Sequence, residues 1–479
     1  MKRIVLILLA ALTLYSCGQQ GIPNNKSVVK GKLTVPSTEM IYLCVDDPHD
    51  FGFDVIPIDS AKMDEKGNFS FNFICPTAMT TLVRLGEEII VWNMFVYPQS
   101  ELQVTIDNSN PIAIKTNYQG KAASANNLFK DLETMFSRDN SFYNEFYNDD
   151  VTPWLNFVDT RYNQGIALLN EFYAKDSVPL PIKDQLDSKV RYAMASAKND
   201  FVLENYYYNP DRRKGLVIDS NYYKFLDKLN LQGTYSDAYT GKYLMTLAEQ
   251  WRFSKLDEGK NPTGVDISLA KYDLARLRFW GKSRDIAMTW ALREMLLNYN
   301  QPEYQDYVKK LLPDYQALLK DKDFAGSIIS LLKRRLALRK DEPAPNFKLP
   351  NYNNQTVKLE DLRGKPVYIA FWGAWLQPSI DGLDKYHDLI AKFKEGTINF
   401  VSVGLEYRNF DNWLKVLNAK QLNAINLYSE RQFENPMPRA YVITAIPTYV
   451  IIDKDGKMFD ADAPGPEDPK TVEILKKLL

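Results

Sequence analysis

The chain has 479 residues, of which 45% are hydrophobic and 25% charged. This composition is typical of a globular protein, and the length exceeds that of one ordinary domain. Its formal net charge of -1 provides no electrostatic attraction to nucleic acid, and two histidines are too few for a histidine-rich zinc site. Glycine-rich nucleotide-binding motifs are absent as well, so we expect no nucleic-acid partner, no metal and no cofactor.

The first 17 residues have the organisation of an export signal. Lys2 and Arg3 precede an apolar stretch, residues 4–14, that is too short to span a bilayer. The stretch ends at Leu-Tyr-Ser-Cys17, which resembles the lipobox of bacterial lipoproteins. The resemblance implies that Cys17 carries the lipid that anchors the mature protein to a membrane. We expect a cell-envelope protein, at the periplasmic face of the outer membrane. The alternative is an ordinary signal peptide with a chance cysteine.

Residues 18–27 have the composition of a flexible tether, and short strands dominate from 28 to 120. Alternating or apolar runs separated by turn residues predict a β-sandwich-like domain. The runs occupy residues 30–35, 40–45, 68–73, 80–85, 89–96 and 102–106.

This region contains the two other cysteines, Cys44 and Cys75. Export would place them in an oxidising compartment, where a disulfide between them could persist. Cys75 also continues the alternation of three phenylalanines, which predicts a small apolar side chain facing a core. The sequence allows either arrangement.

Residues 121–340 have the spacing of helices. Positions 128, 129, 132, 135 and 136 are apolar and form one helical stripe, which predicts a central all-α domain. Similar stripes occupy residues 154–173, 182–206, 222–229, 243–253, 286–299, 304–319 and 324–338.

A proline-rich segment at 341–350 ends the last helix and opens a third domain, residues 341–479. Strands and helices alternate after it, which predicts a central mixed sheet covered on both faces. The expected strands are 367–372, 398–404, 425–428, 448–453 and 457–460, and the expected helices are 380–393, 410–418 and 469–479.

Four segments of this third domain carry a family resemblance. They are A-P-N-F-K-L at 344–349, V-K-L-E-D-L-R-G-K-P-V at 357–367, F-W-G-A-W at 371–375 and A-I-P-T-Y-V-I-I-D-K-D-G-K at 445–457. In this order they resemble a membrane-tethered thioredoxin-like domain of the TlpA/ResA thiol-disulfide interchange type. The resemblance implies an α/β thioredoxin fold. It also implies that the turn after strand 367–372 faces a cis-proline loop at Ile446-Pro447, where relatives pair with an extended substrate segment.

The chain departs from this family at the reactive turn, where active members carry C-x-x-C. Leu376 stands at the attacking cysteine position and Ser379 at the resolving position. Leucine has no nucleophile, and a serine hydroxyl without an adjacent base cannot exchange disulfides. We expect Ser379 to bond a nearby backbone N–H at the helix start. The expectation is therefore a degenerate site, with no catalytic residue and no enzymatic activity.

Without thiols, such a scaffold keeps its recognition surface. We predict an apolar groove for an extended peptide, a protein partner or another ligand, formed by Trp372, Trp375, Leu376, Gln377, Ile446 and Pro447. The simpler interpretation is that the two tryptophans only pack the turn. The alternative function is a redox protein that uses Cys44 and Cys75, or acts with a redox partner, and positions its substrate with the carboxyl-terminal domain.

Overall fold

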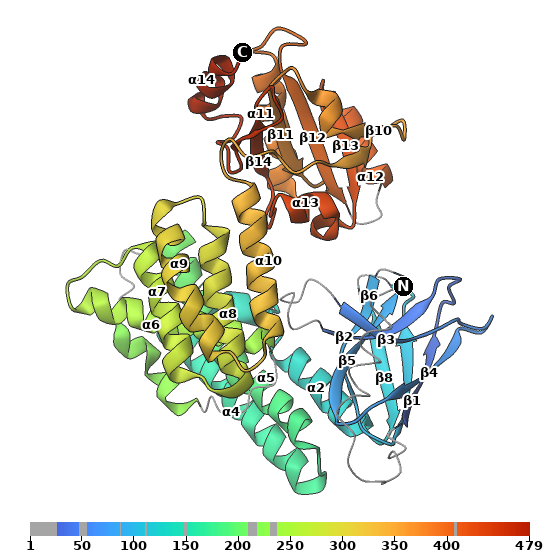
Figure 1. The fold of residues 1–479 in the computed structure, drawn as a ribbon. Coiled ribbons are helices and arrows are strands. Elements are labelled where there is room, and N and C mark those ends of the chain that lie inside the picture. Colours follow the sequence, from blue (N-terminus) through green and yellow to red (C-terminus); the bar gives the residue numbers. More distant parts are fainter. Residues whose placement is uncertain are drawn as a thin grey trace, which may run out of the picture. The chain divides into compact units, whose positions relative to one another are not determined.

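The computed structural model describes residues 26–46, 55–86, 88–110, 113–147, 151–208, 218–229, 237–406 and 410–479 (Figure 1). The chain forms two compact units. The first unit comprises residues 1–46, 55–137 and 164–187, and the second comprises residues 47–54, 138–163 and 188–479. The predicted signal peptide, Cys17 and nearly all of the predicted tether lie outside the described residues.

The first unit is rich in strands, as predicted. One four-stranded sheet has the order β4-β1-β7-β8, and a second has the order β3-β2-β5-β6. The strands of the first sheet are β1 (Lys26–Leu33), β4 (Asn68–Ile74), β7 (Glu101–Asp107) and β8 (Lys115–Gly120). The strands of the second sheet are β2 (Ile41–Asp46), β3 (Val55–Ala61), β5 (Met79–Leu85) and β6 (Glu88–Val96).

The sequence did not predict β3 or β8, and both lie at a sheet edge. β3 contains Pro57 and has no clean alternation of buried and exposed residues. β8 is polar apart from the buried Tyr118. Edge strands pair on one side only, so their sequences need not carry the apolar alternation of a central strand. Helix α2 (Ala123–Met135) follows β8 and packs on it.

The middle of the chain is helical, again as predicted. Its helices, turquoise to orange in Figure 1, are α3 (Asn140–Phe146), α4 (Val151–Lys175), α5 (Leu180–Val202), α6 (Asp237–Asp257), α7 (Gly264–Arg278), α8 (Gly281–Leu297), α9 (Pro302–Leu318) and α10 (Asp323–Ala337). Short helical turns lie at Leu203–Tyr208 and Ser220–Lys228.

Helix α7 has no counterpart among the predicted stripes. It buries small or polar side chains, namely Ser268, Ala270, Tyr272 and Ala275, which hides its inner face from a hydrophobic pattern. A capping box marks its start instead, because Thr263 accepts from the N–H of Asp266 while the Asp266 carboxylate accepts from the N–H of Thr263. None of the described helices is both long and apolar enough to cross a membrane.

The carboxyl-terminal region contains the predicted mixed sheet, in the order β13-β12-β11-β14-β15 (Figure 1). Strands β11, β12 and β13 are parallel, and β14 and β15 are antiparallel to their neighbours. The sheet strands are β11 (Val367–Trp372), β12 (Asn399–Glu406), β13 (Ile425–Glu430), β14 (Thr448–Ile452) and β15 (Met458–Asp460). The helices are α11 (Gln377–Ile390), α12 (Phe410–Lys420), α13 (Pro436–Ala440) and α14 (Pro469–Lys477), and a hairpin of β9 (Lys348–Pro350) and β10 (Thr356–Lys358) precedes the sheet.

Alternate residues of β11 pack into two different cores, because successive side chains of a strand point to opposite faces. Tyr368, Ala370 and Trp372 join a cluster with residues of α11, α12 and α14. The three intervening residues, Val367, Ile369 and Phe371, pack on the other face with α13 and the segment around β9 and β10. Every residue of β11 is therefore buried, which explains its unbroken apolar run.

Candidate functional site

The site lies at the carboxyl end of β11, where a turn leads into α11. Gly373 begins this turn, where any larger residue would have to displace neighbouring side chains. A Cβ built on it would lie 2.6 Å from Trp375 Nε1 and 2.8 Å from Ile446 Cδ1. The Ile446–Pro447 peptide bond is cis. The turn therefore packs directly on the cis-proline loop, as the resemblance implied.

Leu376 and Ser379 occupy the start of α11. Leu376 is the N-cap residue, has an extended backbone and makes no side-chain capping bond. Ser379 is buried, and its Oγ accepts the backbone N–H of Gly373 at 3.1 Å. Ser379 thus bonds a nearby backbone N–H, as predicted, but its partner lies in the turn before the helix and not at the helix start. His387 lies eight residues further along the same helix, about 12 Å away by helical rise, so it does not serve as a base for this hydroxyl.

A buried carboxylate that the sequence analysis missed also contacts the turn. Glu406 ends β12 and is 1% exposed, and its Oε1 accepts the backbone N–H of Ala374 at 2.6 Å. The pKa of Glu406 is raised to about 7, because the effect of burial exceeds the lowering effect of the hydrogen bond from Ala374. The strand register offered a signal for this residue. Trp372 pairs with Gly404, so Glu406 lies beyond the end of β11, at the edge where parallel strands present their ligand-binding residues.

Trp375 and Trp372 have different environments. Trp375 is 48% exposed, and its Nε1 donates to the carbonyl oxygen of Leu405 at 2.9 Å. The turn is also held by Asn412, whose Nδ2 donates to the carbonyl oxygen of Ala374 at 3.2 Å. The bond to Leu405 therefore fixes the orientation of the Trp375 indole, although the residue remains about half exposed.

The prediction that Trp372 lines the groove is wrong. Its side chain is 1% exposed and belongs to the core between the sheet and helices α11 and α12. Period-two alternation along β11 directs it to this face, away from the turn. Its indole Nε1 has no hydrogen-bond partner among the described residues.

The other predicted groove residues lie at the surface of the turn and the cis-proline loop. Gln377 and Pro447 are exposed, and Leu376 and Ile446 are partly exposed. Gln377, the first residue of α11, donates from Nε2 to the carboxylate of Asp381, one turn further along the helix, at 2.7 Å. We call this surface, formed by Trp375, Leu376, Gln377, Ile446 and Pro447, the turn surface.

The remaining cysteines are buried in the first unit. Cys44 lies in β2 and Cys75 follows β4, and both are free thiols in the structure, so the disulfide that the sequence allowed is not formed. Cys75 is fully buried, which confirms that it faces a core, and its Sγ donates to the carbonyl oxygen of Thr77 at 3.0 Å. Burial raises the pKa of Cys44 to about 11 and also raises that of Cys75. Thiols of this kind carry little thiolate at neutral pH.

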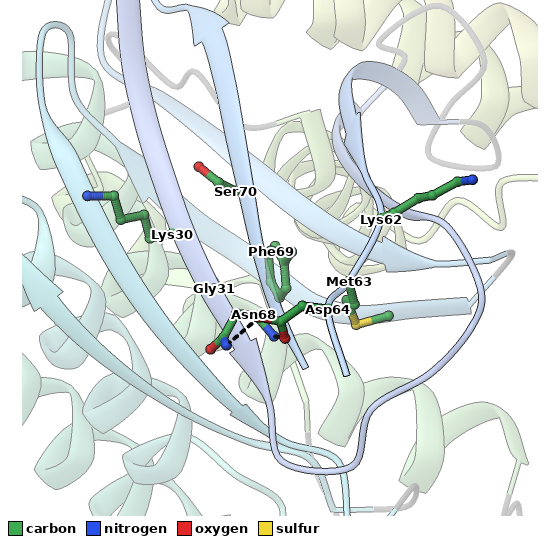
Figure 2. A pocket seen from close by; sticks show the side chains of 8 residues that line it. All are labelled: Lys30, Gly31, Lys62, Met63, Asp64, Asn68, Phe69 and Ser70. Carbon is green, nitrogen blue, oxygen red and sulfur yellow. Dashed lines mark hydrogen bonds between the residues drawn. The ribbon is translucent and has the colours of Figure 1, made fainter. Parts of the chain in front are cut away.

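The structure also has a shallow hollow of about 630 Å³ beside β1 and β4 (Figure 2). Its polar groups do not converge on one point. Asn68 Nδ2 donates to Asp64 at 2.8 Å, Lys30 is paired with Glu101, and the Lys30 and Lys62 side chains lie at opposite sides of the hollow in Figure 2. Among the described residues, no group of three or more His, Cys, Asp or Glu side chains could hold a metal ion.

Comparison with known proteins found similarity in the carboxyl-terminal region. Residues 341–460 match the AhpC/TSA family. The chain is 27% identical over 137 residues to thiol-disulfide oxidoreductase ResA of Bacillus thuringiensis subsp. konkukian, covering 28% of this chain and 76% of that protein. It is 35% identical over 118 residues to ResA of Oceanobacillus iheyensis, covering 22% of this chain and 59% of that protein.

A solved structure of a thiol-disulfide oxidoreductase from Bacteroides fragilis is 20% identical, with a TM-score of 0.27, and the match covers 29% of this chain and all of that one. The family match at residues 341–460 spans the mixed sheet, the turn and the cis-proline loop. The carboxyl-terminal part of this multidomain chain is therefore a thioredoxin-like domain, similar in sequence to ResA-type thiol-disulfide oxidoreductases.

Proposed function

We propose that the protein is a lipid-anchored component of the cell envelope whose thioredoxin-like domain binds an extended peptide or protein segment without thiol chemistry. One observation carries the proposal. Leu376 and Ser379 stand at the helix start where relatives carry their thiols, and the Ser379 hydroxyl is buried as an acceptor for Gly373. All three cysteines of the chain lie before residue 76, far from this helix in the sequence. With neither a thiolate nor an activated hydroxyl, the turn has no group that could attack a disulfide.

The turn surface supports a binding role. Trp375 presents an indole that is anchored through Leu405, and anchored aromatic residues lose little conformational freedom when they bind. Leu376 and Pro447 extend this surface with apolar atoms. β14 pairs with β11 only from Thr448 onward, so the cis-proline loop continues beyond the paired part of the sheet. An extended segment beside this loop would resemble the strand addition that many peptide-binding domains use.

Lipid anchoring is supported by the sequence around Cys17, which lies outside the described residues. Acyl chains on Cys17 would hold the protein at the membrane, at the periplasmic face of the outer membrane in our proposal. We further propose that the two four-stranded sheets after the tether form a β-sandwich.

The second candidate function is a role in thiol-disulfide exchange, and the ResA relatives favour it. Within this chain that role would need Cys44 and Cys75, or a separate redox partner. Burial and raised pKa values keep both thiols protonated and out of contact with solvent, which counts against their use in exchange.

Reduction of insulin by dithiothreitol, followed as turbidity, tests this proposal. The full chain should show no acceleration above the uncatalysed rate. Acceleration that persists after replacement of Cys44 and Cys75 by Ala would overturn the proposal. Acceleration that disappears with those replacements would support the second candidate instead.

A further inference from the structure

A second hollow in the first unit has the features of a ligand site. It lies beside the edge strand β6 of one sheet, the edge strand β8 of the other and helix α2, and its volume is about 710 Å³. Ligand pockets in proteins typically enclose about 300–1,000 Å³. We call it the Trp92 hollow. Its base is formed by the buried residues Ile90, Val91, Tyr118, Asn126 and Phe129, and its rim by Trp92, Asn93, Lys115, Lys130, Glu133 and Thr134.

A β-bulge presents Trp92 at this rim. Thr81 of β5 pairs with Met94, and Val83 pairs with Val91, so both Trp92 and Asn93 lie opposite a single residue. Asn93 has a left-handed backbone with φ of 55°, and Trp92 is 56% exposed. Bulges redirect side chains and are frequent beside functional sites. Asparagine adopts this left-handed conformation more readily than most other non-glycine residues, so the residue type suits the bulge.

Side chains of α2 already occupy the strand edges next to the hollow. Asn126 accepts from the N–H of Phe95 at 2.8 Å and donates to the Phe95 carbonyl oxygen at 2.9 Å, which imitates a neighbouring strand on β6. Lys130 Nζ donates to the Thr116 carbonyl oxygen of β8 at 2.9 Å. Together with the bulge, these contacts hinder strand addition by an extended peptide. The occupant that fits is a compact ligand.

The chemistry of the rim identifies the class of ligand. An exposed indole offers a flat apolar face for the C–H groups of a sugar ring, and the amide, hydroxyl and carboxylate groups beside it can bond sugar hydroxyls. Two lysines and one glutamate give the rim a net positive charge. The Lys130 ammonium has three donors and uses one for Thr116, so it keeps donors for a ligand. We propose that the Trp92 hollow binds a short acidic saccharide, with a sugar ring stacked on Trp92 and its carboxylate near Lys115 and Lys130.

Isothermal titration calorimetry with the detergent-solubilised full chain tests this proposal, with tetragalacturonate as the acidic probe and maltotetraose as the neutral one. We expect saturable binding of tetragalacturonate, with a dissociation constant of about 1 mM or below, and at least about tenfold weaker binding of maltotetraose. Trp92→Ala should weaken tetragalacturonate binding at least about tenfold, whereas Trp92→Phe, which keeps an aromatic face, should retain most of it. The matched control is Trp280→Ala, which removes another exposed tryptophan and should have no effect.

Two charge variants extend the test. Lys115→Gln and Lys130→Gln should each weaken binding of tetragalacturonate and reduce its dependence on salt. The absence of tetragalacturonate binding up to about 10 mM, or equal binding by wild type and Trp92→Ala, would overturn the proposal. Equal affinity for maltotetraose would overturn the assignment of an acidic ligand. Trp92 is exposed, so its replacement should leave the fold intact, and circular dichroism of each variant checks this.

Discussion

The carboxylate of Glu406 and the backbone N–H of Ala374 form a 2.6 Å hydrogen bond that ties the end of β12 to the turn before α11. The bond joins residues 32 positions apart in the sequence. It accompanies three others, from Trp375 to Leu405, from Gly373 to Ser379 and from Asn412 to Ala374, and together they hold the turn. The turn is thus held by a carboxylate, a carbonyl group, a hydroxyl group and a side-chain amide.

Glu406→Gln should change how stability depends on pH. The pKa of Glu406 rises from 4.5 to about 7 on folding, so the folded state binds the proton more tightly than the unfolded state. The folded state is therefore favoured in full by protonated Glu406 below the unfolded pKa of 4.5. This contribution to stability is lost as pH rises through about 7. Glutamine keeps an oxygen acceptor for Ala374 but never becomes charged. The variant should be more stable than wild type at about pH 8, by up to about 3 kcal/mol, and similar to it at about pH 4.

Urea unfolding of both proteins at several pH values measures this difference. Glu406→Ala serves as the control, because it removes both the charge and the acceptor and leaves the Ala374 N–H unpaired. A stability difference between Glu406→Gln and wild type that did not grow between pH 4 and pH 8 would show that Glu406 titrates normally.

Gly373→Ala should destabilise the domain and displace Trp375. The new Cβ would lie 2.6 Å from Trp375 Nε1 and 2.8 Å from Ile446 Cδ1, both shorter than a normal contact. We expect a loss of about 1–3 kcal/mol in the free energy of unfolding and a change in tryptophan fluorescence. Gly326→Ala in α10 is the matched control, because its Cβ meets no atom within 4 Å and alanine favours a helix. Equal effects of the two substitutions would contradict the close packing of the turn on the cis-proline loop.

Two cysteines introduced at the start of α11 should form a disulfide. Positions 376 and 379 lie three residues apart at the start of α11, so Leu376→Cys with Ser379→Cys should form a reversible intramolecular bond. The pKa of the first thiol should lie below the usual value of about 8.5, because a helix amino-terminus stabilises a thiolate. A redox titration against glutathione, with Cys44 and Cys75 replaced by Ala, gives the measurement. Failure to oxidise between about -300 and -150 mV would mean that the family's reactive positions lie elsewhere.

Cys17→Ala should release the protein from the membrane. Acylation requires the cysteine thiol, so the variant should accumulate unprocessed or mis-processed and shift out of the membrane fraction. Fractionation followed by mass spectrometry of the amino-terminal peptide checks both points, with Ser16→Ala as a variant that keeps the thiol. Continued membrane attachment without an acyl chain would rule out the lipid anchor.

The sequence predicted those parts of the domain that local patterns encode. β11 has the predicted bounds because its unbroken apolar run is bounded by Pro366 and Gly373. Ser379 bonds a backbone N–H as predicted, but that N–H belongs to Gly373 in the turn, which a helix-start pattern does not indicate. Glu406 was not predicted, because a glutamate after an apolar strand is normally exposed. Its burial depends on the turn that β11 places beside it.

The burial of the two tryptophans, Trp372 and Trp375, could not be predicted from local sequence patterns either. Both flank Gly373 in an aromatic stretch, so the sequence did not separate the core residue from the surface residue. The pleat of β11 buries Trp372 under helices α11 and α12, whereas Trp375 follows the end of the strand and is not subject to its alternation. In the first unit, Trp92 is exposed through a bulge that depends on the pairing of β6 with β5, which no local pattern reports.

Fluorescence anisotropy with labelled, reduced and carboxymethylated α-lactalbumin, an unfolded chain without thiols, tests the central claim most directly. The full chain should bind it saturably, and Trp375→Ala should weaken binding about five- to tenfold, or about 1–1.4 kcal/mol. Tyr352→Ala removes another exposed aromatic residue of the same domain and should leave the affinity unchanged. Binding that Trp375→Ala and Tyr352→Ala leave equally intact, or no binding at all, would contradict a peptide-binding role for the turn surface.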